Sequence, residues 1–266
     1  MLANNFSLEA YFKRIRFVGA PEATIECVTA LMQHQLYAVP FENLDVQAGK
    51  LVSLVPEDIV EKIINRQRGG YCYEVNGLFS LALTALGVPY RWVGARPMFY
   101  PMRRPKTHMA IVLELAGRQW LCDLGFGSYG ITRPIALDAL GEDVVQGHDH
   151  FRLSKAEDGD FLLQSWVDGA WANQFSFGMQ AQEWVDFEPS NFMNSKHPDA
   201  VFVKSLLVIS HHARGRNILF GNVLKTVVDG EVNKCVLTQP EVEAALVQTF
   251  GIHRPVSTTA MAPSTV

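Results

Sequence analysis

A cysteine preceded by two glycines is the residue of this chain best suited to act as a nucleophile. It lies in the segment Arg68-Gly69-Gly70-Tyr71-Cys72-Tyr73-Glu74-Val75-Asn76. A helix is expected to begin near Cys72, and the unpaired N–H groups and positive dipole of a helix N-terminus favour a thiolate. The glycines let backbone and substrate approach closely. A small buried cysteine without reactivity is the alternative, and this segment alone leaves the two interpretations evenly balanced.

A nucleophilic cysteine needs a base, and the base needs a group that orients it. Residues 107–123 offer both, because they are typical of two strands joined at Ala116-Gly117. If that turn has two residues, the register places Asp123 opposite Ala110. His108 lies two residues from Ala110 on the same face, so His108 and Asp123 become diagonal neighbours about 7–8 Å apart at Cα. A register shifted by one residue would separate them.

Taken singly, His108 is more simply a solvated histidine at a strand end, and Asp123 a turn residue. Taken together with a cysteine at a helix start, the turn register favours a Cys72–His108–Asp123 triad. Cys122 is expected to point to the opposite face of the strand. Such a triad could transfer an acyl group to an amine or to water.

Other candidate residues are weaker. His148-Asp149-His150 could bind a metal, but no third ligand lies nearby, so a polar loop is favoured. Adjacent His211 and His212 would face opposite sides of a strand. Cys27 and Cys235 are expected in the core. The chain also contains no phosphate-binding loop and no dinucleotide motif, so no metal and no bound prosthetic group are expected.

Composition excludes several classes of protein. The chain has 266 residues, of which 48% are hydrophobic and 19% charged, so global disorder is excluded. A net charge of −4 without a Lys/Arg run argues against a nucleic-acid or anionic-membrane partner. Four cysteines without CxxC spacing do not form a disulfide scaffold or a zinc site. No secretory signal is recognisable and residues 78–88 are too short to span a bilayer, so a soluble cytoplasmic protein is expected.

The elements that would position the triad begin with helices. The proline and acids of Pro56-Glu57-Asp58 predict a helix start, and Gly69-Gly70 is expected to end that helix. A second helix is expected from Cys72 to Leu86. From Tyr90 onward, short apolar segments alternate with turn residues, which predicts an antiparallel meander curled into a small barrel.

The last part of the chain mixes strands and a helix. Residues 205–210 and 217–228 are each expected to be a strand, with a tight turn at Asp229-Gly230. Thr238 begins a final amphipathic helix that ends near Gly251, and the tail after Pro255 is expected to be frayed.

Segments along nearly the whole chain resemble the arylamine N-acetyltransferase family. The Cys72 segment is similar to the family signature, and Val39-Pro40-Phe41-Glu42-Asn43-Leu44 to a second motif. Further matches follow in chain order: Tyr11-Phe12-Lys13-Arg14-Ile15, His108-Met109, Asp123-Leu124-Gly125-Phe126-Gly127, Asn191-Phe192, Ser195, His197-Pro198, Phe202 and Phe250-Gly251-Ile252.

This resemblance implies an α+β fold with a cysteine-protease-like core. Residues 1–89 would form an N-terminal helical bundle that carries the nucleophile. Residues 90–198 would form a central antiparallel β-barrel that carries the histidine and aspartate. Residues 199–266 would form a C-terminal α/β lid. This division matches the one drawn from the residues alone.

The resemblance also implies roles for the triad. Cys72 would hold an acetyl group as a thioester, and its backbone N–H would contribute to an oxyanion hole. His108 would act first as base and then as acid, while Asp123 would orient the imidazole. Glu42 and Arg68 would form an ion pair that supports the catalytic loop.

For the substrates, the resemblance implies acetyl-CoA as acyl donor and a small arylamine, arylhydrazine or arylhydroxylamine as acceptor, used in a ping-pong mechanism. Phe41, Tyr71, Phe126 and Phe202 would line the acceptor pocket, and Gly125 and Gly127 would lie near acetyl-CoA. The alternatives are a cysteine hydrolase (amidase or peptidase) with the same triad and a binding module with an inert Cys72.

Overall fold

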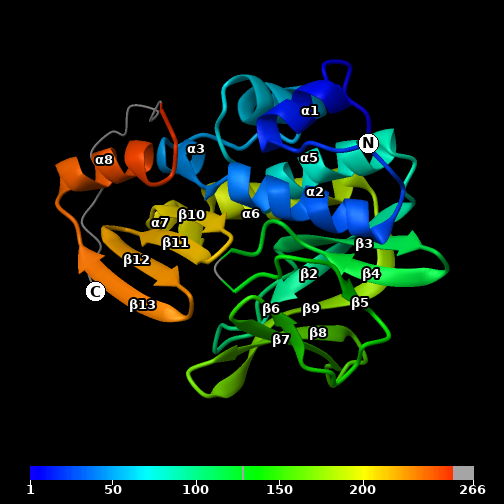
Figure 1. Cartoon of the computed structure of the whole chain (residues 1–266). Coiled ribbons are helices and arrows are strands. Elements are labelled where there is room, and N and C mark those ends of the chain that lie inside the picture. The colour runs from blue at the N-terminus through cyan, green and yellow to red at the C-terminus, as the bar shows by residue number, and fades with distance from the viewer. Residues whose placement is uncertain (128, 254–266) are drawn as a thin grey trace.

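Helices at the N-terminus, a large curled sheet and a smaller sheet with a helix beside it make up the fold (Figure 1). The structure is a computed structural model that describes residues 1–127 and 129–253. The expected α+β class is confirmed. The tail after Pro255 lies outside the described residues. No helix among the described residues is long and apolar enough to cross a membrane.

The N-terminal helices pack above the larger sheet, and α5 lies at their centre (Figure 1). All residues of α5 from Cys72 to Leu83 are buried, and the polar residues among them, Glu74, Asn76 and Ser80, form hydrogen bonds. The helices are α1 (Leu8–Ile15), α2 (Ile25–Ala38), α3 (Leu44–Gln47), α4 (Pro56–Val60), the π-helical turn η1 (Glu61–Asn65) and α5 (Cys72–Ala85).

The helix that begins at Pro56 ends at Asn65, four residues before the predicted stop at Gly69-Gly70. Gln67 has a left-handed backbone with φ of 53°, which turns the chain back. Gly70 then bridges to Phe41 of the short strand β1 (Phe41–Glu42). A Cβ atom on Gly69 would lie 2.0 Å from the Pro40 carbonyl oxygen, so this glycine is needed for close approach of two backbones.

The larger sheet has eight strands in the order β5-β4-β3-β2-β9-β8-β7-β6, and all neighbouring pairs are antiparallel. The strands are β2 (Tyr90–Pro97), β3 (His108–Leu115), β4 (Arg118–Cys122), β5 (Ile135–Ala136), β6 (Val144–Gln146), β7 (Asp149–Lys155), β8 (Phe161–Val167) and β9 (Ala170–Gln182).

The predicted register of the β3–β4 hairpin is confirmed, since Leu115 pairs with Arg118. Ala116 and Gly117 have φ of 52° and 72°, so the turn has the two left-handed residues of the type I′ hairpin. Cys122, which was expected on the opposite face of the strand from Asp123, lies in the hydrophobic core. This turn therefore fixes which residues after β4 share a face with His108.

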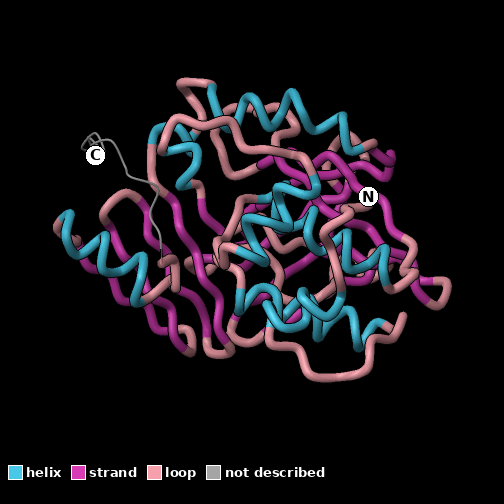
Figure 2. The backbone as a smooth tube through the Cα atoms, turned by 90° about the horizontal axis from the view of Figure 1, so that it is seen from above, coloured by secondary structure: helices cyan, strands magenta, loops and turns pink. Residues whose placement is uncertain are grey.

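The smaller sheet has the order β1-β10-β11-β12-β13. One of its edges is therefore β1, which lies between α2 and α3 in the sequence. Seen from above, this sheet and α8 lie to one side of the other helices (Figure 2). Its other elements are β10 (Leu207–His212), β11 (Gly215–Phe220), β12 (Val223–Val228), β13 (Glu231–Val236) and α8 (Gln239–Gln248). Between the sheets, the chain forms η2 (Trp184–Phe187), α6 (Glu188–Lys196) and α7 (Val201–Lys204).

Two predictions for this part were wrong. Residues 217–228 form a hairpin rather than one strand, because Gly221 takes a left-handed backbone with φ of 57° and Phe220 pairs with Val223. Cys235 is exposed on β13 rather than buried, since this strand forms the outer edge of the sheet and all its residues are exposed.

A buried ionic network supports the segment that leads into α5. Arg68 Nη2 lies 2.7 Å from Glu42 Oε1, so the expected ion pair is present. Lys62 Nζ lies 2.7 Å from Asp45 Oδ2 and 2.7 Å from Glu74 Oε1. Two cations thus face three carboxylates, and burial raises the pKa of Glu74 to about 6, although the Lys62 charge opposes this shift.

We therefore predict that Lys62→Met lowers the free energy of unfolding by about 3–5 kcal/mol, because it leaves buried carboxylates without their partner. Chemical denaturation measures this loss. Lys13→Met, on an exposed position of α1, is the control and should change stability by less than about 0.5 kcal/mol. Equal losses in the two variants would contradict the role of the network.

Candidate active site

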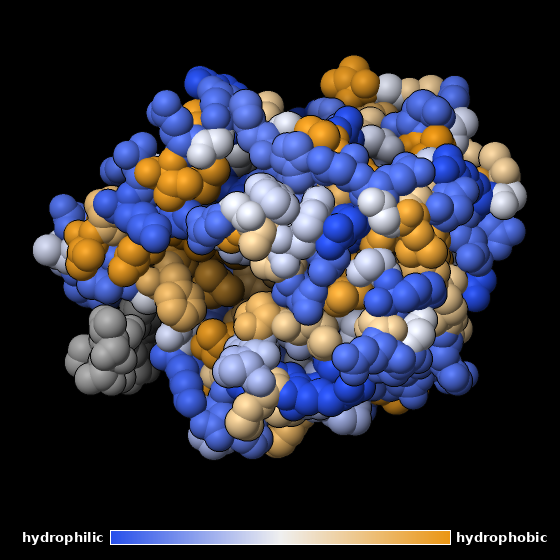
Figure 3. All heavy atoms as spheres, turned by 90° about the horizontal axis from the view of Figure 1, so that it is seen from below, coloured by the Kyte–Doolittle hydropathy of each residue, from blue (hydrophilic) through white to orange (hydrophobic). Residues whose placement is uncertain are grey.

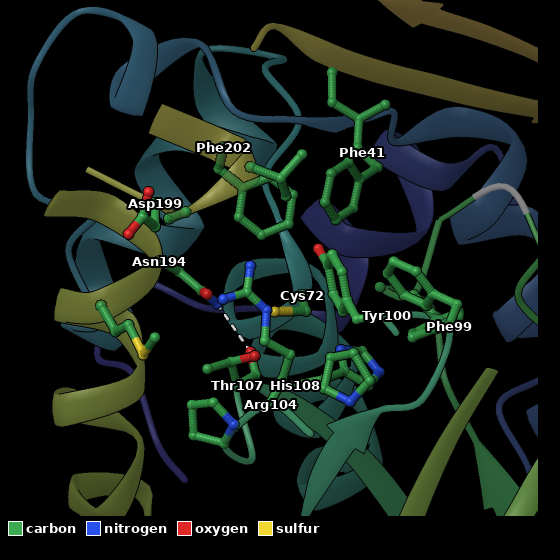
Figure 4. Close-up of a pocket in the computed structure, with 18 of the residues that line it drawn as sticks. Phe41, Cys72, Phe99, Tyr100, Arg104, Thr107, His108, Asn194, Asp199 and Phe202 are labelled. Carbon is green, nitrogen blue, oxygen red and sulfur yellow. Dashed lines mark hydrogen bonds between the residues drawn. The ribbon is translucent and has the colours of Figure 1, made fainter. Parts of the chain in front are cut away.

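Three elements bring Cys72, His108 and Asp123 to one place. Cys72 is the first residue of α5, His108 is the first residue of β3, and Asp123 directly follows β4. His108 Nε2 lies 2.7 Å from Asp123 Oδ2, and both side chains are buried. The diagonal pair predicted from the hairpin register is therefore present, and Cys72 and His108 face the same cavity (Figure 4).

The environment of Cys72 differs from the one predicted for a helix start. The N–H groups of Tyr73 and Met109 contact its sulfur and favour the thiolate, but burial raises the pKa of the Cys72 thiol well above its usual range. The nearby Asp123 charge adds to that rise. A thiolate here would need a positive charge nearby, and His108 and Arg104 line the same cavity as Cys72.

The cavity beside Cys72 and His108 has a volume of about 400 Å³ and mostly apolar walls. In the close-up, Phe41 and Phe202 lie on one side of Cys72 and His108 on the other (Figure 4). Viewed from below, the molecule shows a hollow with apolar walls (Figure 3). Six Phe and Tyr side chains line the cavity: Phe41, Phe99, Tyr100, Phe126, Phe202 and Phe220. A cavity of this size and character suits a small aromatic molecule.

Comparison with known proteins decides the family. A family model described as N-acetyltransferase matches residues 24–258. The arylamine N-acetyltransferase of Escherichia coli (strain K12) is 33% identical over 219 residues, which cover 81% of this chain and 76% of that protein. The arylamine N-acetyltransferase of Mycobacterium tuberculosis (strain H37Rv) is 34% identical over 217 residues, with coverage of 78% and 76%. The chain belongs to the arylamine N-acetyltransferase family.

Solved structures of family members have the same fold. The arylamine N-acetyltransferase structure from M. tuberculosis matches with a TM-score of 0.89 at 32% identity, covering 93% of this chain and 94% of that one. The Mycobacterium marinum arylamine N-acetyltransferase, solved in complex with CoA, matches with a TM-score of 0.87 at 30% identity, with coverage of 92% and 93%.

Within this arylamine N-acetyltransferase fold, Tyr71 does not line the cavity, although the sequence placed it there. Its side chain is fully buried behind the wall. The hydroxyl bonds to Asn191 and lies 3.1 Å from Ser195 Oγ, while the ring packs edge-on against Phe202 at 5.8 Å. Tyr71 therefore supports the aromatic wall from behind, because its position before α5 turns its ring inward.

The two glycines assigned to acetyl-CoA differ in what they require. Gly125 lines the cavity, and a Cβ atom on it would lie 2.5 Å from Cys72 Cα, so a side chain would displace the nucleophile. Gly127 is not on the cavity wall. Its φ of 103° is a conformation that L side chains rarely adopt, and it packs against Ile209. The close packing at Gly125 and the positive φ of Gly127 therefore each explain the glycine without reference to acetyl-CoA.

Asn76 is a site residue that sequence reasoning did not assign. Its Nδ2 donates to the Met109 carbonyl at 2.8 Å and to Asp123 Oδ1 at 3.1 Å. Its Oδ1 accepts from Leu124 N at 2.9 Å. Asn76 lies four residues after Cys72 and therefore on the same face of α5. This spacing, within the segment similar to the family signature, could have predicted that Asn76 lies near Cys72.

His148, Asp149 and His150 do not gather with further ligands. Within residues 1–127 and 129–253, no group of three or more His, Cys, Asp or Glu side chains has an arrangement that could hold a metal ion.

We predict that Asn76→Ala lowers kcat about 10²-fold, because Asp123 and the chain after it lose their anchor to α5 and the imidazole is no longer held. Steady-state kinetics measures the effect. The pH profile of kcat/KM should also shift, which a purely structural loss of folded protein would not cause. A variant with normal kcat and an unchanged pH profile would show that Asn76 does not position the pair.

Proposed function

We propose that this chain transfers an acetyl group from acetyl-CoA to the nitrogen of an arylamine, arylhydrazine or arylhydroxylamine through a thioester on Cys72. One observation carries the proposal. Cys72 and His108 open on an aromatic-walled cavity, and His108 is held by Asp123 at 2.7 Å, in a chain of the arylamine N-acetyltransferase family. The related M. marinum enzyme solved in complex with CoA supports acetyl-CoA as the donor.

In the first half-reaction, His108 takes the thiol proton of Cys72. Its Nε2 is engaged by Asp123, so Nδ1 is the nitrogen available to the thiol. The thiolate attacks the thioester carbonyl of acetyl-CoA, and the backbone N–H of Cys72, in the first turn of α5, stabilises the oxyanion. CoA leaves with the proton from His108. The step exchanges one thioester for another and is nearly isoenergetic.

In the second half-reaction, a neutral arylamine attacks the carbonyl carbon of acetyl-Cys72. His108 accepts the proton that the amine nitrogen loses, and it returns a proton to the sulfur of Cys72 as the C–S bond breaks. Asp123 keeps the imidazole in one orientation and stabilises its cationic form. The products are the N-acetylated amine and the free enzyme.

The walls of the cavity would select the acceptor. We assign Phe41, Phe126 and Phe202 to binding of the aromatic ring, since all three line the cavity. Gly125 and Gly127 would lie along the path of acetyl-CoA. The apolar walls would also slow hydrolysis of the thioester by water.

We further propose a division into a helical bundle (residues 1–89), a β-barrel (90–198) and a lid (199–266). Its partners would be an aromatic amine and acetyl-CoA, without nucleic acid or membrane, and the chain would act in the cytoplasm. The cysteine hydrolase alternative is not favoured, because the related proteins are acetyltransferases.

A thioester on Cys72 predicts a covalent adduct in the absence of an acceptor. Incubation with acetyl-CoA alone should add one acetyl group to the intact mass of the protein, and adding an aromatic amine should remove it. Cys72→Ala should show no adduct. An adduct that persists in Cys72→Ala, or none in either protein, would exclude the proposed intermediate.

Because acetyl-CoA and amine react in separate half-reactions, initial rates should follow ping-pong kinetics. Double-reciprocal plots at several fixed concentrations of amine should give parallel lines. Intersecting lines would instead require both substrates to be bound together, and release of acetate without any amine would favour the hydrolase.

A further inference from the structure

A second cavity of about 390 Å³ lies between the larger sheet and the smaller one and shares no lining residue with the cavity at Cys72. We call it the basic cavity. Its walls include the β6–β7 turn, the end of β8, the segment from Tyr129 to Arg133 and the far end of the β10–β11 hairpin. The side chains used below are Tyr129, Arg133, His211, Arg214, Arg216 and Lys225.

Charge in the basic cavity is positive, although the whole chain has a net charge of −4. Four cations line it, Arg133, Arg214, Arg216 and Lys225, together with the carboxylates Asp149 and Asp168. Arg214 is paired with Asp229 and Arg216 with Asp149, so the positive charge comes from Arg133 and Lys225. Among the described residues, neither Arg133 nor Lys225 forms an ion pair with a carboxylate. Lys225 Nζ is instead 3.3 Å from the Tyr129 hydroxyl. These cations are available to an anion from solution.

Arg216 gives the basic cavity a fixed floor. Its side chain is only 7% exposed, and Nη2 donates to Asp149 Oδ1 at 3.0 Å. Its Nε is buried and has no hydrogen-bond partner. Burial, together with the Arg216 charge, lowers the pKa of His211 to about 4, so this imidazole is neutral at pH 7. Nη1 also donates to Asp149 Oδ2, so the floor is a bidentate ion pair whose buried Nε still has no partner.

The β10–β11 hairpin connects the two cavities. Leu207 and Phe220 line the cavity at Cys72, and His211 and Arg216, four residues further along each strand, line the basic cavity. Four strand residues span about 13 Å. The His211 ring also contacts the backbone of Gly127, in the loop that follows Asp123. The two cavities therefore share the hairpin and the loop after Asp123 as walls, and they lie about 13 Å apart along the strands.

We propose that the basic cavity binds the phosphate groups of a small molecule. Lysine and arginine side chains around a rigid floor match the charge and the several acceptor oxygens of a diphosphate. Two sources have this chemistry: the nucleotide end of a CoA thioester whose acyl end is at Cys72, or a separate phosphorylated metabolite. The first source rests on the proposed function, and the second does not.

Pyrophosphate binding to the full-length chain, measured by titration calorimetry, tests the site. Arg133→Gln/Lys225→Gln should weaken binding about tenfold, because two charge-assisted contacts are lost. Lys13→Gln/Lys50→Gln removes the same charge from two exposed positions elsewhere and should bind as the wild type does. Absence of binding to the wild type, or equal weakening in both double variants, would overturn the proposal.

The ratio of kcat/KM for acetyl-CoA to that for S-acetylpantetheine, which lacks the nucleotide, identifies the source. If the basic cavity holds the CoA nucleotide, Arg133→Gln/Lys225→Gln lowers this ratio about tenfold. If the ligand is a separate metabolite, pyrophosphate binding weakens and the ratio stays at the control value. Failure of the wild type to use either thioester would refute the proposed function alone, since pyrophosphate binding needs no turnover.

Discussion

The Asp123 carboxylate is the junction on which the rest of the site depends. One oxygen faces His108 of β3, and the other accepts from Asn76 of α5 and from the backbone N–H of Gly125. A single buried group therefore joins the helix that carries Cys72 to the sheet that carries His108. Because Asp123 bonds to β3, to α5 and to the loop at Gly125, a shift of any one of these would break a buried hydrogen bond.

Burial at this junction sets the chemistry of Cys72. A buried thiol loses its proton reluctantly, and the carboxylate nearby makes that harder. In the proposed mechanism the proton passes to His108, which opens on the same cavity as Cys72 and is held by Asp123. The helix N-terminus contributes through the N–H groups that contact the sulfur, but it does not determine the thiolate by itself. Reactivity therefore belongs to the assembled site and not to the Cys72 segment.

The sequence was informative where local rules fix geometry. Ala116-Gly117 determined the hairpin register, and that register alone brought His108 and Asp123 together. It was uninformative where tertiary packing decides. Nothing local distinguishes Tyr71, which packs behind the cavity wall, from Phe41, which lines it. The turn at Gly221 was missed because apolar residues flank it on both sides, and the pattern reads through as one strand.

The prediction that Cys235 is buried failed for a different reason. Burial of a strand depends on whether it lies at the edge of a sheet, and strand order is not a local property. The ionic network was predicted only in part, since Glu42 and Arg68 were paired from the family resemblance. Lys62, on the π-helical turn, joins that pair to Glu74. A π-helical turn contains one more residue than an α-helical turn, so the direction of Lys62 does not follow from the α-helical period.

The cavity at Cys72 is lined by distant parts of the chain, and Asn43 holds two of them together. Its Nδ2 donates to the carbonyl oxygens of Phe202 and Ser205, both at 2.8 Å, and its Oδ1 accepts from Leu207 N at 2.7 Å. Phe41, two residues earlier, packs against Phe202 with ring centroids 5.8 Å apart. The Phe41–Phe202 side of the aromatic wall therefore depends on the contacts by which Asn43 holds residues 202–207 against the N-terminal part of the chain.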